Sequence, residues 1–332
     1  MIVPQLGLSG KSLLKLADLT DQQMLGLVDF AIALKARKAA REHLDEPLLK
    51  GRNIALVFQK SSTRTRCATV TAVRDEGGCA EYLSQADIHF GKKESVKDTA
   101  RVLGRLFDGI LFRGFAHETV EELARFAGVP VWNGLTDLWH PTQILADLQT
   151  IKEYFGQVKG LKLAYIGDGR NNVCNSLMRG CAKAGMDMVD VCPPELSPDP
   201  ALFAAAQAEA RRNGCTVSVS HDPILGVQGA HVLYTDVWVS MGEENVFNQR
   251  LEMLRPFQIT MDMARRTGNL ESGRLIFLHC LPAFHNHDTD VSRELGALEV
   301  TDEVFEAPFS KVFDEAENRM HTIKAMILAS LA

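Results

Sequence analysis

The stretch that decides the fold starts with the apolar run Ile54-Ala55-Leu56-Val57-Phe58 and continues into Ser62-Thr63-Arg64-Thr65-Arg66. The apolar run is typical of a buried strand, and the polar stretch opens a helical pattern that extends to Gly77. Basic side chains at a helix N-terminus face the positive end of the helix dipole, so two arginines there need an anion. The hydroxyl groups and the backbone N–H groups of the first turn are suited to hold a phosphate. A solvated, capped helix surface is the alternative interpretation, and we favour the phosphate.

The composition indicates a globular protein with two domains. The chain has 332 residues, too many for one ordinary core, of which 46% are hydrophobic and 23% charged. Its net charge of -6 lacks the basic excess of nucleic-acid-binding proteins. Seven cysteines without the spacing of a disulfide framework predict reduced thiols. No signal peptide and no apolar run of ~18 residues is recognisable, so we expect a cytoplasmic protein with no membrane or nucleic-acid partner.

Strand-like apolar runs alternate with helical patterns along the whole chain, which predicts parallel sheets covered by helices. We therefore expect an α/β protein with two doubly wound domains, at residues 1–150 and 151–310. The last segment, residues 311–332, has the pattern of a long amphipathic helix, and we expect it to pack back on the first domain.

Strands are predicted at Asn53 to Phe58, Gly109 to Arg113, Val129 to Trp132, Leu161 to Ile166, Met188 to Val191, Thr216 to Val219, His231 to Thr235 and Leu275 to His279. Helices are predicted at Asp21 to Ala36, Arg64 to Gly77, Ser95 to Phe107, Glu118 to Ala127, Pro141 to Phe155 and Lys311 to Leu331.

Polar clusters follow the predicted strands at six places. In open α/β sheets, ligands bind at the carboxyl ends of the strands, so these clusters predict one binding site. The clusters are Ser62 to Arg66, Arg113, His140 with Gln143, Gly167 to Asn172, Asp236 to Gly242 and His279 to His285.

In the first half, Arg113 ends a buried strand, where a charged side chain is usually paired. A ligand oxygen is the partner that we favour, with a core carboxylate as the alternative. His140 and Gln143 begin a helix and are suited to a neutral carbonyl oxygen and an amide group. Alone, the His-Pro pair indicates only a helix start. Together with Arg64 and Arg113 it favours ligand binding.

In the second half, Asp236 and Ser240 are suited to an α-amino acid, because a carboxylate holds an ammonium group and a hydroxyl reaches a carboxylate. An Asx-type turn is an equally good interpretation. The turn from Gly167 resembles a dinucleotide fingerprint, but Asn172 stands where a third glycine is needed. NAD is therefore only weakly indicated, although Asp187 and Asp190 stand near the place of a ribose-binding acid.

The segment His279-Cys280 carries zinc-type ligands, but the spacing fits no closed tetrahedral pattern. We predict no metal and no cofactor. A cysteine after a buried strand is usually a small core residue, so Cys280 gains a role only if it meets Asp236.

Seven motifs occur in order over nearly the whole chain: STRTR, GKKESVKDTARVLGRLFDGI, HPTQ, GDGRNN, DVWVSMGE, HCLPAFH and ENRMHTIKA. Together they resemble the ornithine carbamoyltransferase family within the aspartate/ornithine carbamoyltransferases. The resemblance implies transfer of the carbamoyl group of carbamoyl phosphate to the δ-amine of L-ornithine, giving L-citrulline and phosphate, in arginine synthesis or breakdown. It also implies a homotrimer, or a multiple of trimers, with sites at subunit interfaces.

The resemblance further implies roles for individual residues. The residues that it implies for carbamoyl phosphate binding are Ser62, Thr63, Arg64, Thr65, His89, Arg113, His140, Gln143, Cys280, Leu281 and Arg319. Cys280 and Leu281 would also lie near the amine of ornithine. The residues that it implies for ornithine binding are Asn172, Asp236, Ser240 and Met241. The groups that we expect to be catalytic are Arg113, His140, Asp236 and Cys280.

Two departures from the family pattern stand near the phosphate motif. His89 replaces a common glutamine that reaches the phosphate from a neighbouring subunit, and Ala68-Thr69-Val70-Thr71 replaces an SFEV-like sequence. The first bears on the pH dependence of phosphate binding, and the second on the packing of the helix.

Carbamoyl phosphate carries a good leaving group, so the protein need supply mainly orientation and charge stabilisation. We expect Arg64, Arg113 and His140 to stabilise the oxyanion. Asp236 and Cys280 would orient the amine or help to deprotonate it. A nicotinamide-dependent oxidoreductase and a non-catalytic phosphate sensor are the alternatives from other classes.

Overall fold

A computed structural model describes residues 3–42, 47–88, 93–239 and 246–331. The chain forms two compact units, the first of Met1–Gln149 with Glu317–Ala332 and the second of Thr150–Ala316. The division falls within two helices, α5 (Pro141–Phe155) and α13 (Val312–Leu331).

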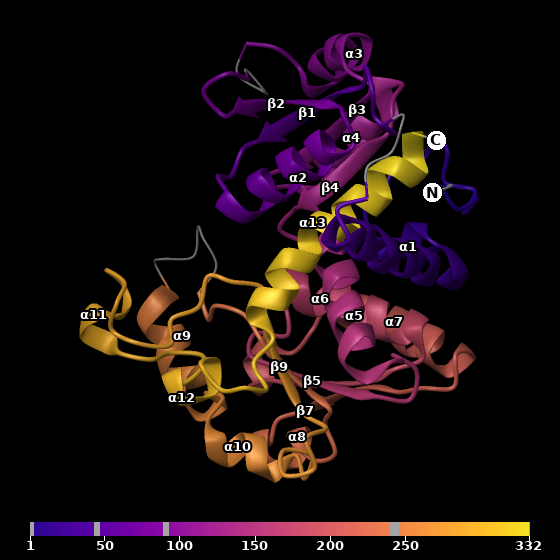
Figure 1. The fold of residues 1–332 in the computed structure, drawn as a ribbon. Helices are drawn as coiled ribbons and strands as arrows, with labels where there is room; N and C mark the ends of the chain where they lie inside the picture. Colours follow the sequence, from indigo (N-terminus) through magenta and orange to yellow (C-terminus); the bar gives the residue numbers. More distant parts are fainter. Residues whose placement is uncertain (1–2, 43–46, 89–92, 240–245, 332) are drawn as a thin grey trace. The chain divides into compact units, whose positions relative to one another are not determined.

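The first unit is built on a parallel sheet with the strand order β2-β1-β3-β4 (Figure 1). Its strands are β1 (Asn53–Phe58), β2 (Cys79–Ser84), β3 (Gly109–Arg113) and β4 (Val131–Leu135). The apolar run of β1 is buried from Ile54 to Phe58. Phe58 is paired with Arg113 in the ladder of β1 and β3, so the polar groups after the two strands start from the same sheet edge.

Helices α1 (Asp21–Ala39), α2 (Thr63–Asp75), α3 (Val96–Leu106) and α4 (His117–Ala127) complete this unit, together with the short 3-10 helix Leu16–Asp18 and the first part of α5. Apolar residues of α3 and α4 pack on β1 and β3, among them Leu103, Val120 and Leu123 against Val57 and Phe112. Residues 317–331 of α13, drawn in yellow, also belong to this unit (Figure 1).

The second unit has a parallel sheet with the order β7-β6-β5-β8-β9. Its strands are β5 (Lys162–Ile166), β6 (Asp187–Val191), β7 (Val217–Ser220), β8 (Val232–Thr235) and β9 (Ile276–His279). Its helices include α6 (Asn172–Ala184), α7 (Pro200–Arg212), α8 (Pro223–Val227), α9 (Phe247–Leu254), α10 (Met261–Arg266), α11 (Ser292–Leu295) and α12 (Asp302–Phe305). The strand order reverses between β5 and β8, and such a switch point is where an open α/β sheet binds ligands.

The predicted fold class, two doubly wound α/β domains with parallel sheets, is confirmed. Most predicted elements agree with the structure within two residues, but the strand expected at Val129 to Trp132 lies at Val131–Leu135. Pro130 has no N–H group for a ladder, and only its carbonyl oxygen takes part, accepting from Ile110 N over 2.9 Å. Strand β2 was missed, because this half-exposed edge strand has no continuous apolar run.

Among the described residues, no helix combines the length and the apolar character that a membrane crossing requires.

Candidate active site

The first group of predicted residues lies at the N-terminus of α2. Ser62 is the N-cap, and its hydroxyl accepts from the backbone N–H of Thr65 over 3.2 Å. Thr63 is exposed and Arg64 is half-buried. The first turn of α2 contains no acidic residue, so the positive end of its dipole has no compensating charge on the helix itself. This helix start is suited to an anion.

Two arginines that are far apart in the sequence meet at one hydroxyl group of α2. Arg113 donates from Nη1 to Thr65 Oγ1 over 3.4 Å, and Arg319 donates from Nη2 to the same oxygen over 3.1 Å. Arg319 also donates to Gln143 Oε1 over 2.7 Å, and Gln143 Nε2 donates to Asp147 over 2.9 Å. These side chains are all buried. They connect the end of β3 with α2, α5 and α13.

His140, just before α5, is the imidazole of this cluster and is 4% exposed. Burial lowers the pKa of His140 well below its usual value, and the charges of Arg319, Arg113 and Arg64 lower it further. The ring is therefore neutral at physiological pH. A neutral imidazole N–H beside three guanidinium groups can donate to a carbonyl oxygen that gains negative charge.

The second departure from the family pattern changes a buried position of α2. Thr69 is fully buried, and its hydroxyl donates to the carbonyl oxygen of Thr65 over 2.8 Å. This bond satisfies the polar group that the substitution brings into the helix interior.

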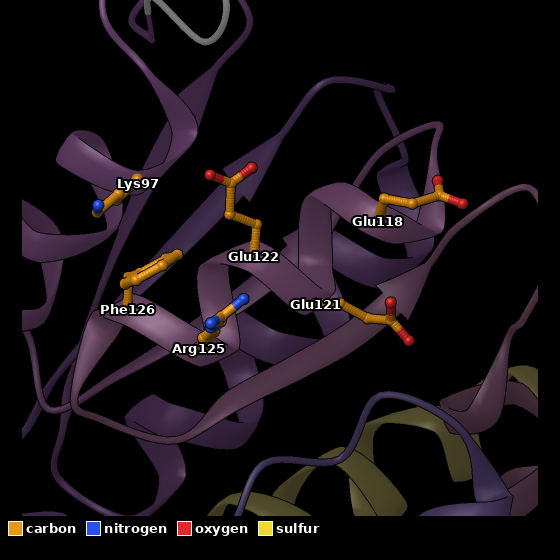
Figure 2. A pocket seen from close by; sticks show the side chains of 6 residues that line it. All are labelled: Lys97, Glu118, Glu121, Glu122, Arg125 and Phe126. Carbon is orange, nitrogen blue, oxygen red and sulfur yellow. The ribbon is translucent and has the colours of Figure 1, made fainter.

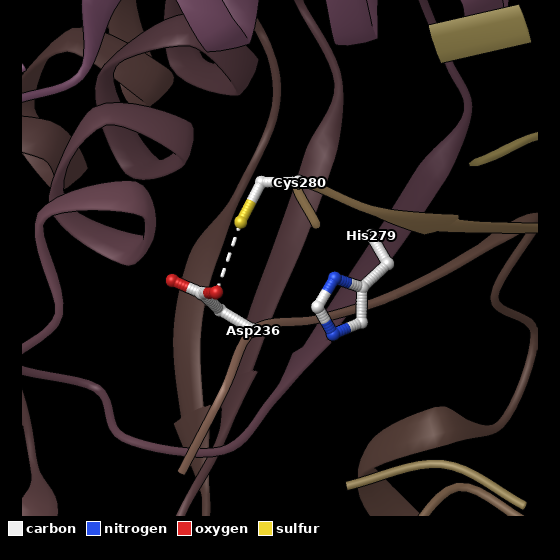
Figure 3. A group of neighbouring side chains, drawn as sticks. All are labelled: Asp236, His279 and Cys280. Atoms are coloured by element: carbon white, nitrogen blue, oxygen red, sulfur yellow. Dashed lines mark hydrogen bonds between the residues drawn. The ribbon is translucent and has the colours of Figure 1, made fainter. Parts of the chain in front are cut away.

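In the second unit, two of the predicted residues, Asp236 just after β8 and Cys280 just after β9, are in contact. Cys280 Sγ donates to Asp236 Oδ1 over 2.9 Å, and the backbone N–H of Val237 donates to the same oxygen over 2.8 Å (Figure 3). Asn171 Nδ2 donates to Asp236 Oδ2 over 3.1 Å. Asp236 is 8% exposed. The contact on which a role for Cys280 depended is thus present.

The loop after β9 fixes the direction of Cys280. His279 Nδ1 accepts from the backbone N–H of Leu281 over 2.9 Å, which leaves the proton of the neutral ring on Nε2, 3.3 Å from Glu299 Oε1. The backbone N–H of His279 donates to Glu315 over 2.8 Å. Leu281 has a φ of 58°, in the left-handed region that residues with side chains rarely adopt. Such conformations persist where surrounding contacts hold them, as these do.

The turn after β5 brings a residue to the site that the sequence analysis did not name. Asn171 caps α6 by accepting from Val173 N over 2.7 Å, and it holds Asp236 with its amide group. Asn172, the predicted ligand, is the first residue of α6 and is half-buried. The doubled asparagine in GDGRNN was the available signal, but it did not indicate which of the two faces Asp236.

The same turn argues against a dinucleotide. Asp190 is fully buried, and a Cβ added at Gly169 would overlap Asp190 Oδ2. Its carboxyl group is thus packed behind the turn, where a ribose hydroxyl has no access. Asp168 in the turn pairs with Arg250 over 2.7 Å and with Arg170 over 3.2 Å.

Among the described residues, two groups of side chains have donor atoms within 4.8 Å of one another, as in metal sites: Asp236 with His279 and Cys280, and His285 with Asp302 and Glu306. In the first group, which Figure 3 shows, both ring nitrogens of His279 contact protein atoms. Asp236 accepts three hydrogen bonds, of which the figure draws the one from Cys280. In the second, His285 Nδ1 lies 2.6 Å from Asp302 and its ring stacks on Phe305. Protein contacts account for both arrangements.

A pocket of about 540 Å³ lies on α3 and α4 (Figure 2). Its lining residues are Lys97, Glu118, Glu121, Glu122, Arg125 and Phe126. Lys97 and Arg125 lie over the ring of Phe126, at 5.0 and 5.3 Å from its centroid. None of the predicted ligand residues lines this pocket.

Three predicted site residues, His89, Ser240 and Met241, lie outside the described residues. Besides Asn171, two residues of these clusters were not predicted. Thr142 has its hydroxyl 3.4 Å from Arg319 Nη2. Arg250 is the buried partner of Asp168.

Comparisons with known proteins agree with this geometry. Residues 11–153 match the family described as "Aspartate/ornithine carbamoyltransferase, carbamoyl-P binding domain", and residues 159–330 match its "Asp/Orn binding domain". The chain is 55% identical to the catabolic ornithine carbamoyltransferase of Bacillus licheniformis, over 98% of both chains, and 52% identical to that of Streptococcus pyogenes, over 97% of this chain and 96% of the other.

Solved structures lead to the same family. The ornithine carbamoyltransferase of Pyrococcus furiosus superposes with a TM-score of 0.89 at 39% identity, covering 98% of both chains. That of Gloeobacter violaceus superposes with a TM-score of 0.82 at 41% identity, covering 98% of this chain and 99% of the other. The chain belongs to the aspartate/ornithine carbamoyltransferase family, as a member of the ornithine carbamoyltransferase type.

Proposed function

We propose that this protein transfers the carbamoyl group of carbamoyl phosphate to the δ-amine of L-ornithine, giving L-citrulline and phosphate. The observation that carries the proposal is the convergence of Arg113 and Arg319 on Thr65 at the N-terminus of α2. Two buried guanidinium groups at the positive end of a helix make a receptor for a phosphorylated ligand.

In this proposal, the first unit holds carbamoyl phosphate. The phosphate oxygens accept hydrogen bonds from Ser62, Thr63, Arg64 and Thr65 and from Arg319. Arg113, the neutral His140 and Gln143 hold the carbamoyl end. An imidazole that keeps one ring N–H and carries no charge can donate to the carbonyl oxygen without repelling the arginines beside it.

The reaction needs no covalent intermediate with the protein. The lone pair of the δ-amine attacks the carbonyl carbon, and the carbonyl oxygen gains negative charge that Arg64, Arg113 and His140 stabilise. The carbonyl group re-forms as the bond to the phosphate oxygen breaks. The nitrogen of the adduct loses one proton, which the departing phosphate can accept.

The second unit holds ornithine in this proposal. Asp236 binds its ammonium group, and Asn172, Ser240 and Met241 bind the rest of the amino acid. Asp236 accepts from the thiol of Cys280, so Cys280 acts as a hydrogen-bond donor here. We therefore assign Cys280 and the adjacent Leu281 to orienting the amine rather than to removing its proton.

We propose a homotrimer, or a multiple of trimers, with sites at subunit interfaces to which His89 contributes. We propose the cytoplasm as its location, because none of the seven cysteines forms a disulfide bond. We also propose arginine breakdown, in which the same reaction runs in reverse from citrulline and phosphate, as its role, because relatives at 52–55% identity are named catabolic, whereas a structure named anabolic is 35% identical. A deletion strain that loses growth on arginine would support breakdown, and one that requires added arginine would contradict it.

A substrate panel tests the proposed function. Citrulline and phosphate should form in equal amounts from carbamoyl phosphate and ornithine. Putrescine, which lacks the carboxylate, and aspartate, which lacks the side-chain amine, should react at least ~100-fold more slowly, because unpaired polar groups in a site are costly. Equal rates with aspartate, or reduction of a nicotinamide cofactor, would refute the proposal.

A further inference from the structure

Strand β6 carries two aspartates in different surroundings. Asp187 begins the strand and is half-buried, and its Oδ1 accepts from the backbone N–H and the hydroxyl of Thr216, both over 2.8 Å. Asp190 lies three residues later and is fully buried, between Tyr165 on β5 and Val219 on β7 in the sheet register. Only Asp187 has the solvation and the hydrogen bonds that an ionised carboxylate normally requires.

The groups around Asp190 favour its protonated form. Neither carboxyl oxygen accepts a hydrogen bond from a nitrogen or oxygen donor of the described residues, and the thiols of Cys192 and Cys174 are its neighbouring donors. Burial is the main cause that raises the pKa of Asp190 to about 8, and the charge of Asp168 raises it further, while the thiols of Cys192 and Cys174 act in the opposite direction. At neutral pH the group is thus a carboxylic acid.

Asp190 lies directly behind the turn that carries the amino-acid site. A Cβ at Gly169 would overlap Asp190 Oδ2 and would lie 2.7 Å from the carbonyl oxygen of Leu196. The turn is therefore in close contact with the buried carboxyl group. Two residues after Gly169, Asn171 caps α6 and donates to Asp236. A small displacement of this turn would move Asn171 relative to Asp236.

We propose that Asp190 is a positioning residue for ornithine: its neutral carboxyl group supports the turn from Gly167 to Asn171, and its ionisation displaces this turn and weakens ornithine binding. The inference rests on the proposed function. A charge on Asp190 would be desolvated and would lie near Asp168, so the turn has to move or admit water to relieve it.

Three neighbouring titratable groups do not change charge together with Asp190. Burial raises the pKa values of Tyr165 on β5, Cys174 on α6 and Cys192 after β6, so all three stay neutral at the pH at which Asp190 ionises. Asp168 is paired with Arg250 and Arg170. His221, which follows β7, contacts the carbonyl oxygen of Cys192 with its Nδ1 atom.

The test measures the KM for ornithine from about pH 6.5 to about pH 9.5 in the wild type and in Asp190→Asn, with Asp187→Asn as the matched control. The ratio of wild-type to variant KM cancels the titration of the substrate itself. If only the neutral form binds ornithine, this ratio for Asp190→Asn rises about tenfold by pH 9, whereas the KM for carbamoyl phosphate shows no such rise. The ratio for Asp187→Asn stays constant.

A constant ratio for Asp190→Asn, within about twofold over this pH range, would overturn the inference. So would an equal rise in the KM for carbamoyl phosphate, because that would indicate a general change of the fold. If Asp190→Asn does not fold, Asp190→Leu provides a neutral, apolar side chain of similar size for the same measurement.

Infrared spectroscopy of the wild type observes the carboxyl group of Asp190 directly. The infrared band of a protonated carboxyl should be present at about pH 6.5, should disappear above about pH 9, and should be absent from Asp190→Asn. A band that does not titrate in this range would refute the inference. A protein that forms no citrulline at any pH would instead refute the proposed function, and the infrared titration would still report on Asp190.

Discussion

Arg319 donates from Nη2 to Thr65 Oγ1 over 3.1 Å, although 254 positions separate the two residues in the chain. Five residues after Arg319, Lys324 pairs with Asp75 at the other end of α2 over 2.7 Å. Helix α13 thus contacts α2 near both ends of α2. The attachment fixes the position of a guanidinium group at a helix start that is suited to phosphate.

Arg113→Ala should lower kcat by about a hundredfold or more, because removing one preorganised donor to a developing oxyanion costs ~3 kcal/mol. The measurement is steady-state citrulline formation, with circular dichroism to verify that the variant is folded. Arg105→Ala, the same substitution at an exposed position of α3, is the control and should retain wild-type kcat. Wild-type kcat in Arg113→Ala would remove this side chain from the mechanism.

His140 should contribute no change in activity between about pH 6.5 and pH 8. Burial and the neighbouring arginines lower its pKa well below 6.5, so the ring binds a proton only under more acidic conditions. Acid pH charges the ring and also lowers the stability of the folded state, because the unfolded chain binds this proton more readily than the folded chain does. The check is the profile of log kcat against pH for the wild type and for His140→Gln. A step near pH 6.5 that is lost in His140→Gln would contradict the neutral ring.

Lys324→Met should destabilise the protein by about 3 kcal/mol, because it leaves the buried carboxylate of Glu76 and the partly exposed carboxylate of Asp75 without one of their partners. Lys324 is 1% exposed and lies 2.7 Å from Asp75 and 3.5 Å from Glu76, which also pairs with Arg37. Lys38 pairs with Asp75 over 2.5 Å but is 40% exposed, so Lys38→Met should cost at most about 1 kcal/mol. Urea unfolding measures both. Equal losses of stability would show that burial is not what distinguishes the two pairs.

Asn171 should have two separable roles. Asn171→Ser keeps an N-cap residue but loses the amide donor to Asp236, so the KM for ornithine should rise about fivefold or more while stability changes little. Asn171→Ala loses both groups, so it should show the same rise in KM and a loss of about 1 kcal/mol of stability. Wild-type KM values in Asn171→Ser would show that the contact with Asp236 does not matter for ornithine.

Much of the fold and of the placement of both candidate site groups could be predicted from the sequence. The apolar run of β1 and the hydroxyl and arginine residues after it predicted the start of α2 correctly, because strand burial and helix capping are local properties. The positions of Arg113 at the end of β3 and of Asp236 just after β8 were also predictable, because parallel strands present their carboxyl ends at one edge.

The remaining features depend on contacts that the sequence does not display. Strand β2 is an edge strand in which Glu81 interrupts the apolar pattern. Lysine is rarely buried, so nothing in the sequence of α13 predicts that Lys324 pairs with Asp75. The difference between Asn171 and Asn172 depends on the geometry of one turn, since both residues belong to the same motif.

In the proposed reaction, Asp236 binds ornithine while the arginine cluster around Thr65 binds carbamoyl phosphate. The sharpest test follows label from carbamoyl phosphate, carried in its carbamoyl carbon, in the wild type and in Asp236→Asn. We expect the wild type to transfer the label to citrulline. We expect Asp236→Asn to bind carbamoyl phosphate with wild-type affinity but to form at least ~100-fold less citrulline at equal ornithine concentration. Unchanged transfer of label in Asp236→Asn, or loss of its carbamoyl phosphate binding, would refute this division of roles.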